Sequence, residues 1–266
     1  MNLLTYNTYL PDTLEYQKRI PLFILHGLLG SKENWRNIAK HFSQYRPVYA
    51  LDLRNHGDSP HMKGMSYREM YQDVIKVAKH ENRQSFYLLG HSMGGKVAMQ
   101  LALSEPSYVK KLIVVDIAPR PYPLWHQKTL AGLLSVPFDK LETRKEIDRY
   151  LEPWIADKVE RVFILKNLKR NKKGQSNVFS WRCNLQEISR SYLKIANFTV
   201  VNQTFKGDTL FIRGEHSHYI QDSDIPLVKL LFPKSSIISI NSASHLPHIQ
   251  NTEAFILSVT NFLSGD

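Results

Sequence analysis

Short apolar runs alternate with amphipathic segments in two parts of the chain. Residues 21–26 form a continuous apolar run that ends at Gly27, which is typical of a parallel strand buried on both faces. Ser66, with Glu69 three residues later, has the pattern of a capping box and predicts the start of a helix. The same alternation predicts further strands at 47–51, 86–89 and 111–115, and further helices at 33–44 and 93–104.

After Asp116 the pattern changes. Three prolines at 119, 121 and 123 interrupt regular structure, and three or four amphipathic helical stretches follow without a convincing strand. The alternation resumes with strands at 209–213 and 236–240 and helices at 224–231 and about 252–263. We therefore expect an α/β fold: a mostly parallel sheet with helices on both faces and a helical cap inserted between strands. The core domain would comprise residues 1–119 and 207–266, and the cap residues 120–206.

Composition is that of an ordinary globular protein of 266 residues, with 42% hydrophobic and 22% charged residues. The single cysteine, Cys183, cannot close an intramolecular disulfide, which favours a reducing compartment. The N-terminus lacks the pattern of a signal peptide, and no apolar run approaches the roughly 20 residues that span a bilayer. We expect a cytoplasmic protein without a membrane span, as a monomer or small homo-oligomer.

Charge is the unusual bulk property, because the formal net charge is +11. Residues 121–206 hold 16 Lys and Arg against 8 Asp and Glu, so most of the excess lies in the predicted cap. A basic chain raises the question of nucleic-acid binding, but no recognition motif is present and we expect no nucleic-acid partner. Two interpretations stay open: a solvated helical surface, or attraction of an anionic leaving group such as the phosphates of an acyl-CoA.

The most specific local motif is Gly90-His91-Ser92-Met93-Gly94-Gly95, between a predicted strand and a predicted helix. A serine on such a sharp turn has a strained backbone, and small neighbours are needed because larger side chains would collide. The hydroxyl then projects over the carboxyl edge of the sheet. This context predicts that Ser92 is a nucleophile.

A serine nucleophile needs a base and a carboxylate that orients it. His245 follows the last predicted strand, on the same edge as Ser92. Of the other histidines nearby, His26 and His56 are expected on loops near this edge, and His248 could lie on the surface. His91, next to the serine, is expected inside the turn and pointing elsewhere.

Two positions compete for the carboxylate. Asp116 ends the strand that follows the serine's helix, which also places it at the carboxyl edge. The loop after the next strand is the commonest alternative, but it has Ser217 where an aspartate is expected, with Asp222 a few residues later. We choose Asp116 as the acid and keep Asp222 as the alternative.

The loop from His26 to Gly30 contains two glycines directly after the first long strand. They let the chain turn so that the N–H of Leu28 can meet that of Met93, which predicts an oxyanion hole. The same glycines suggest phosphate binding, but neither glycine-rich phosphate motif is present. Two histidines, His216 and His218, lie two apart without an evident third metal ligand, so we expect no metal and no organic cofactor.

The order of these motifs resembles the α/β-hydrolase superfamily along the whole chain. More narrowly, Asp52 to Pro60, Gly90 to Lys96 and Val115 to Pro119 resemble the YbfF group of bacterial esterases and its mitochondrial α/β-hydrolase-domain relatives. The resemblance implies a cap between strands 6 and 7 of the fold, Ser92 as nucleophile, His245 as base, Asp116 as acid, and Leu28 and Met93 as oxyanion donors. Ser244 departs from the group, in which glycine usually precedes the histidine.

The expected function is hydrolysis of a small-molecule carboxylic ester or acyl thioester through an acyl-enzyme. Alternatives with the same serine triad are a C–C hydrolase, a cofactor-free haloperoxidase or the menaquinone-pathway lyase, and a silent receptor or scaffold would use the same fold. An apolar acyl pocket is expected from aromatic residues of the cap: Trp125, Trp154, Phe163, Phe179 and Trp181.

Overall fold

The computed structural model describes residues 2–172, 178–198 and 203–264. A seven-stranded sheet forms its centre, in the order β1-β3-β2-β4-β5-β8-β9. Every neighbouring pair is parallel except β1 with β3, which confirms the predicted mostly parallel sheet. The strands are β1 (Tyr6–Tyr9), β2 (Leu22–Leu25), β3 (Val48–Leu51), β4 (Phe86–His91), β5 (Val109–Val115), β8 (Asp208–Gly214) and β9 (Ser235–Ile240).

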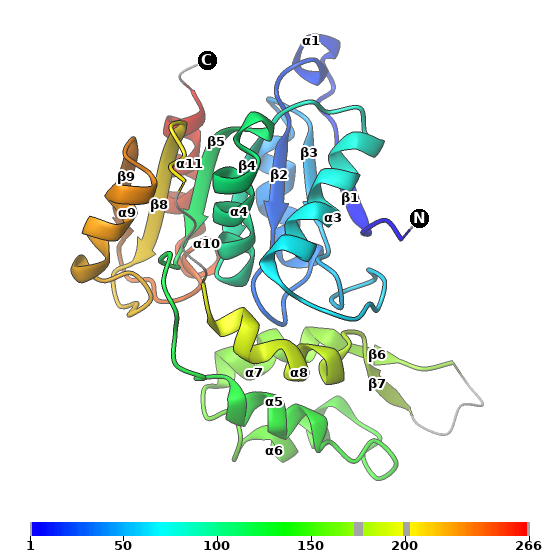
Figure 1. The fold of residues 1–266 in the computed structure, drawn as a ribbon. Helices are drawn as coiled ribbons and strands as arrows, with labels where there is room; N and C mark the ends of the chain where they lie inside the picture. Colours follow the sequence, from blue (N-terminus) through cyan, green and yellow to red (C-terminus); the bar gives the residue numbers. More distant parts are fainter. Residues whose placement is uncertain (1, 173–177, 199–202, 265–266) are drawn as a thin grey trace.

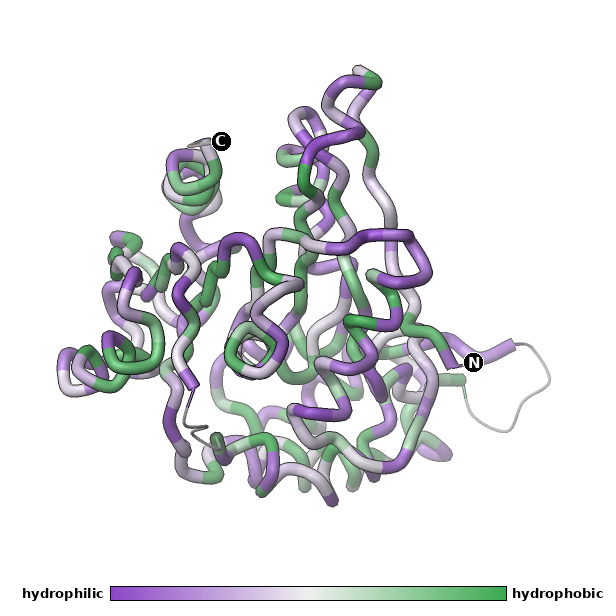
Figure 2. The backbone as a smooth tube through the Cα atoms, turned by 45° about the horizontal axis from the view of Figure 1, so that its top comes forward, coloured by the Kyte–Doolittle hydropathy of each residue, from purple (hydrophilic) through white to green (hydrophobic). Residues whose placement is uncertain are grey.

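Alternate residues of the central strands build two hydrophobic cores, one on each face of the sheet. In β4, for example, Phe86 and Leu88 join one core, whereas Tyr87 and Leu89 join the other. The first core is covered by α3 (Tyr67–His80), α4 (Met93–Ser104) and α9 (Ile225–Leu231), and the second by α2 (Arg36–Phe42) and α11 (Thr252–Leu263). Figure 1 shows this layering, and in Figure 2 hydrophobic positions recur along the central strands while polar stretches occupy many of the connections.

The chain between β5 and β8 forms a separate layer beyond one end of the sheet (Figure 1). We call residues 120–206 the insertion. It contains α5 (Gln127–Leu134), α6 (Arg144–Leu151), α7 (Lys158–Ile164), α8 (Leu185–Ala196) and the strands β6 (Leu168–Arg170) and β7 (Phe179–Trp181). The strands β6 and β7 pair antiparallel, which corrects the expectation of a purely helical segment. The family resemblance implied an insertion between strands 6 and 7. In the described sheet five strands, β1 to β5, precede the insertion, so it lies between the fifth and sixth sheet strands in chain order.

Two further elements differ from the prediction. The helix expected at 33–44 is divided into a 3₁₀ turn, Lys32–Trp35, and α2. Strand β1 was not predicted, because its sequence YNTY is polar and its residues are half-buried or exposed at the sheet edge. The capping box of Ser66 and Glu69 is present as expected. The remaining short elements are α1 (Leu14–Gln17), α10 (Pro247–Gln250) and the 3₁₀ turns Pro106–Tyr108, Leu165–Asn167 and Asp222–Asp224.

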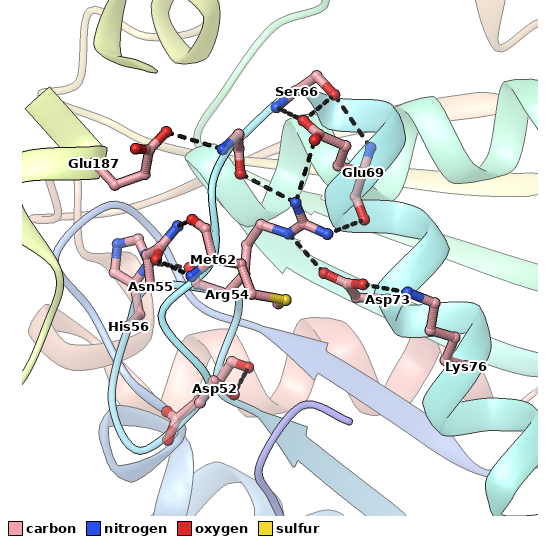
Figure 3. A network of polar contacts seen from close by, with 12 residues as sticks. Asp52, Arg54, Asn55, His56, Met62, Ser66, Glu69, Asp73, Lys76 and Glu187 are labelled. Atoms are coloured by element: carbon pink, nitrogen blue, oxygen red, sulfur yellow. Dashed lines mark hydrogen bonds and ion pairs between the residues drawn. The ribbon is translucent and has the colours of Figure 1, made fainter. Parts of the chain in front are cut away.

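The loop that follows β3 is held by buried ion pairs (Figure 3). The Asp52 carboxylate accepts from the Lys32 ammonium at 2.5 Å, and the Arg54 guanidinium donates to Asp73 of α3 at 2.6 Å. The Gly64 N–H then donates to the Glu187 carboxylate of α8 at 2.9 Å. This part of the Asp52 to Pro60 motif is therefore a scaffold that fixes a core loop and extends toward the insertion.

A buried lysine joins the insertion to the helix that follows Ser92. The Lys96 side chain is 2% exposed, and its ammonium donates to the carbonyls of Ala196 and Asn197 at 2.8 and 3.1 Å. These carbonyls end α8, where the helix dipole favours a cation. The ammonium also lies 4.7 Å from the centre of the Tyr122 ring. Burial lowers the pKa of Lys96 to about 7.

Candidate active site

Ser92 lies on the sharp turn between β4 and α4, at the middle of the sheet. Its backbone has φ 52° and ψ −116°, a region that L residues occupy only when their surroundings enforce it. A Cβ on Gly90 would lie 2.2 Å from the Gly94 carbonyl oxygen, and one on Gly94 would lie 2.5 Å from that of His26. The two glycines are thus required by close packing of the backbone, and this packing holds Ser92 in its strained conformation.

The structure brings Ser92, His245 and Asp116 together from three separate segments. The Nε2 atom of His245 lies 3.1 Å from the Ser92 hydroxyl oxygen, and its Nδ1 atom lies 2.8 Å from Asp116 Oδ2. Tyr219 stacks on the imidazole of His245, with ring centres 3.7 Å apart and planes 16° from parallel. A ring held between a carboxylate, a hydroxyl and an aromatic face has a fixed orientation, with Nδ1 placed to donate and Nε2 to accept.

Asp116 is fully buried, and its carboxylate accepts two further hydrogen bonds. The Gly214 N–H donates to Oδ1 at 3.0 Å, and the Ser217 hydroxyl donates to Oδ2 at 2.5 Å. Asp222, the alternative acid, instead pairs with Arg213 at 2.7 Å, with 80% of its side chain exposed. Ser217 therefore occupies the loop where an aspartate was the alternative, and it binds the carboxylate that comes from the preceding strand.

Replacing Ser217 by alanine is expected to lower kcat for an ester roughly tenfold. The substitution removes one donor to the buried Asp116 carboxylate, and a hydrogen bond to a charged group contributes roughly 1.5–3 kcal/mol, only part of which changes during the reaction. Steady-state kinetics would measure the effect, with Ser217→Thr as the control that retains a hydroxyl. Equal losses in both variants would contradict this role.

The other histidines near the site are buried and neutral. Burial lowers the pKa of His26 to about 4 and of His56 to about 3, and each ring accepts a backbone N–H, from Leu53 at 2.9 Å and from Leu29 at 3.2 Å. His26 and His56 thus fix the loops beside the site. The expectation that His248 could lie on the surface was wrong, because this residue is only 3% exposed. Its ring stacks on the indole of Trp35, which buries the apolar ring face.

His91 has a role that the sequence did not indicate. Its Nε2 lies 2.7 Å from the backbone carbonyl oxygen of His245, and burial holds its pKa well below the ordinary value. A neutral His91 ring therefore donates to that carbonyl. The residue before the nucleophile consequently anchors the loop that carries His245.

Leu28 and Met93 both lie beside Ser92. The first turn of α4 closes with the Lys96 N–H on the Ser92 carbonyl, so the Met93 N–H has no acceptor inside the helix. Within residues 2–172, 178–198 and 203–264, neither the Met93 N–H nor the Leu28 N–H has a hydrogen-bond acceptor. Two unpaired donors next to a serine are suited to bind an oxyanion.

Two pockets meet at Ser92. The larger has a volume of about 260 Å³ and contains His245, together with residues of α7. The smaller, of about 40 Å³, contains Met93 and several aromatic rings but not His245. Phe163 lines the larger pocket and Trp125 the smaller, as expected for acyl-pocket candidates.

The other three aromatic candidates pack inside the insertion rather than against these pockets. Trp154 covers Gly132, where a Cβ would lie 2.4 Å from the indole. Trp181 donates its indole N–H to the Leu133 carbonyl at 2.9 Å. Phe179 is half-buried against the core. The sequence alone cannot distinguish aromatic rings that pack in the core from rings that line a pocket, and this accounts for the error.

Among residues 2–172, 178–198 and 203–264 there is no group of three His, Cys, Asp or Glu side chains placed to hold a metal. Nor does any described helix have the length and apolar character needed to span a membrane.

Comparison with known proteins identifies the relatives of this chain. The family described as alpha/beta hydrolase fold matches residues 20–252. The sn-1-specific diacylglycerol lipase ABHD11 of Danio rerio is 38% identical over 251 residues, which cover 91% of this chain and 78% of that protein. The protein of the same name from Mus musculus is 36% identical over 262 residues, which cover 95% of this chain and 84% of that protein. A solved structure, "Marine microorganism esterase", matches with a TM-score of 0.92 and 38% identity, covering 99% of this chain and 100% of the other.

Proposed function

Since the chain belongs to the α/β-hydrolase family, we propose that it is a serine esterase with Ser92 as nucleophile, His245 as base and Asp116 as acid. The observation that carries the proposal is the hydrogen-bonded series from Ser92 through His245 to Asp116. The esterase and lipase names of the relatives support the choice of reaction. Loss of ester hydrolysis in Ser92→Ala is the test, and it is argued in the Discussion.

In the proposed cycle, Ser92 attacks the ester carbonyl while His245 accepts its proton. The carbonyl oxygen becomes an oxyanion that the N–H groups of Leu28 and Met93 bind. His245 then donates its proton to the departing alcohol, and the acyl group stays on Ser92. Water, deprotonated by His245, attacks the acyl-enzyme; His245 then returns this proton to the Ser92 oxygen as the carboxylic acid leaves. Asp116 holds the imidazole in orientation and stabilises its protonated form throughout.

The positions of the two pockets indicate which part of the substrate each one holds. His245 must reach the oxygen of the leaving alcohol, and it lines only the larger pocket. The smaller pocket contains Met93, one of the proposed oxyanion donors. It is therefore the space into which the acyl chain extends from the bound carbonyl carbon. We assign the larger pocket to the alcohol and the smaller to the acyl chain.

Short acyl chains are the expected substrates. The acyl pocket has a volume of only about 40 Å³ between tyrosine and tryptophan rings, and forcing extra methylenes into a packed site typically costs roughly 1–3 kcal/mol. We expect kcat/KM for p-nitrophenyl acetate or butyrate to exceed that for the palmitate ester at least about tenfold. A series from acetate to palmitate measures this, and a maximum at palmitate would contradict the pocket assignment.

Acyl thioesters are a second candidate substrate class, because the same attack applies to their carbonyl. The basic excess of the insertion supports them, since it could attract the phosphates of an acyl-CoA. Binding of an acyl-CoA that persists undiminished at high salt would argue against this contribution. The C–C hydrolase, haloperoxidase, lyase and scaffold alternatives would gain weight if neither esters nor thioesters were hydrolysed.

A further inference from the structure

The larger pocket beside Ser92 has an acidic wall, although the chain as a whole is basic. Asp157 and Glu160, at the start of α7, line it, and none of its lining residues is Lys or Arg. The formal net charge of the chain is +11. The local field in this pocket therefore opposes the charge of the chain, and it acts where the proposed function places the alcohol.

The two carboxylates differ in what already occupies them. Asp157 caps α7 and accepts from the backbone N–H groups of Val159 and Glu160. Its Oδ1 is thus engaged in holding the helix. Glu160 Oε1 lies 3.9 Å from Nδ1 of His126. Glu160 is therefore the carboxylate that is available to a ligand.

His126 does not neutralise Glu160 near pH 7. Burial lowers the pKa of His126 to about 4, and its Nε2 lies 3.2 Å from the Tyr219 hydroxyl, so the ring is a neutral imidazole. Partial burial and the negative charge of Asp157 raise the pKa of Glu160 above its ordinary value. Both effects disfavour an isolated carboxylate, and a bound cation would relieve them.

We propose that Glu160 makes this pocket select esters whose alcohol carries a positive charge, such as amino alcohols and quaternary ammonium alcohols. The inference rests on the proposed esterase function and on the assignment of the larger pocket to the alcohol. Phe163 and Tyr219 line the same pocket, and aromatic rings beside a carboxylate add to the attraction of an organic cation. The departing alcohol lies next to His245, on the side where α7 presents Glu160.

A pair of matched esters isolates the charge. Butyrylcholine and 3,3-dimethylbutyl butyrate have the same acyl group and nearly the same shape, but only the first has a cationic nitrogen. We expect the wild type to show a kcat/KM at least about fivefold higher for butyrylcholine, in line with a partly exposed charge interaction. In Glu160→Gln the ratio is expected to fall to about one, mainly because KM for butyrylcholine rises more than KM for the neutral ester.

Two variants serve as controls. Glu142→Gln removes one negative charge from an exposed position of the insertion that does not line the pocket, and the ratio should stay at the wild-type value. Glu160→Asp retains the charge and should retain part of the preference. Thermal unfolding of each variant shows whether α7 is intact.

The outcomes separate the inference from the proposed function. A wild-type ratio of one or less, or a ratio unchanged in Glu160→Gln, would overturn the role of Glu160. Failure to hydrolyse even the neutral ester would instead refute the esterase proposal. In that case calorimetric binding of choline against 3,3-dimethylbutan-1-ol decides the inference: tighter binding of choline that Glu160→Gln abolishes supports it, and equal binding refutes it.

Discussion

Replacing Ser92 by alanine is expected to lower kcat for a butyrate ester by roughly 10⁴- to 10⁶-fold, the range seen when a triad serine is removed. The Ser92 hydroxyl oxygen lies 3.1 Å from His245 Nε2. Ser92 also lines both pockets. Without this hydroxyl no acyl-enzyme forms, and only water attack beside the oxyanion donors remains. Hydrolysis of p-nitrophenyl butyrate by purified wild type and variant measures the loss.

Covalent labelling distinguishes the loss of a nucleophile from the loss of the fold. A fluorophosphonate probe should modify the wild type at Ser92 and leave Ser92→Ala unmodified. Ser258→Ala is the matched control, because this serine lies on α11, where its hydroxyl donates to the Ala254 carbonyl. Full activity in Ser92→Ala, or labelling at another serine, would remove the basis of the proposed mechanism.

Asp116→Asn is expected to lower kcat by roughly 10⁴-fold, since an amide at this position favours the wrong imidazole tautomer. Asp116 Oδ2 lies 2.8 Å from His245 Nδ1, and an amide N–H at that position cannot accept the Nδ1–H. The imidazole would then present a proton, rather than a lone pair, to Ser92. Comparison of kcat for p-nitrophenyl butyrate between wild type and variant measures the effect, and the geometry of Ser92 should be unchanged.

Asp222→Asn is the internal control for this experiment. Asp222 is largely exposed and paired with Arg213, so its neutralisation should change kcat less than twofold. The reverse result, with Asp222→Asn inactive and Asp116→Asn active, would move the acid to the loop after β8. Asp116 follows β5 and Asp222 lies in the loop after the neighbouring strand β8. The two variants therefore compare the two candidate acids at the same edge of the sheet.

The sequence predicts the architecture well where local chemistry is strong. The run before Gly27 and the elbow around Ser92 predict β2, β4 and α4, because buried parallel strands are continuously apolar and the elbow tolerates only small neighbours. Helix α4 has the predicted bounds, Met93–Ser104. Edge strand β1 could not be predicted in this way, since its sequence YNTY is polar and lacks the apolar pattern of the central strands.

The site depends on contacts that no local pattern contains. The sequence favours Asp116 but leaves Asp222 as an alternative, and the structure places Asp116 Oδ2 2.8 Å from His245 Nδ1 while Asp222 pairs with Arg213. The bond from Ser217 to Asp116 joins residues 101 positions apart, and Glu160 lines a pocket together with Ser92 and His245, which lie far from it in the sequence. Such pairings are set by how the insertion and loops pack, and only three-dimensional structure shows them.

The buried Lys96 ammonium adds a charged contact to the interface between helix α8 of the insertion and helix α4 of the core. An ammonium buried against two carbonyls and an aromatic ring has lost most of its hydration, and any separation of α8 from α4 returns water to it. Rehydration of the charge then offsets part of the apolar contact that separation loses. A wholly hydrophobic seam would lack this compensation, so the charged joint lowers the free-energy cost of separating α8 from α4.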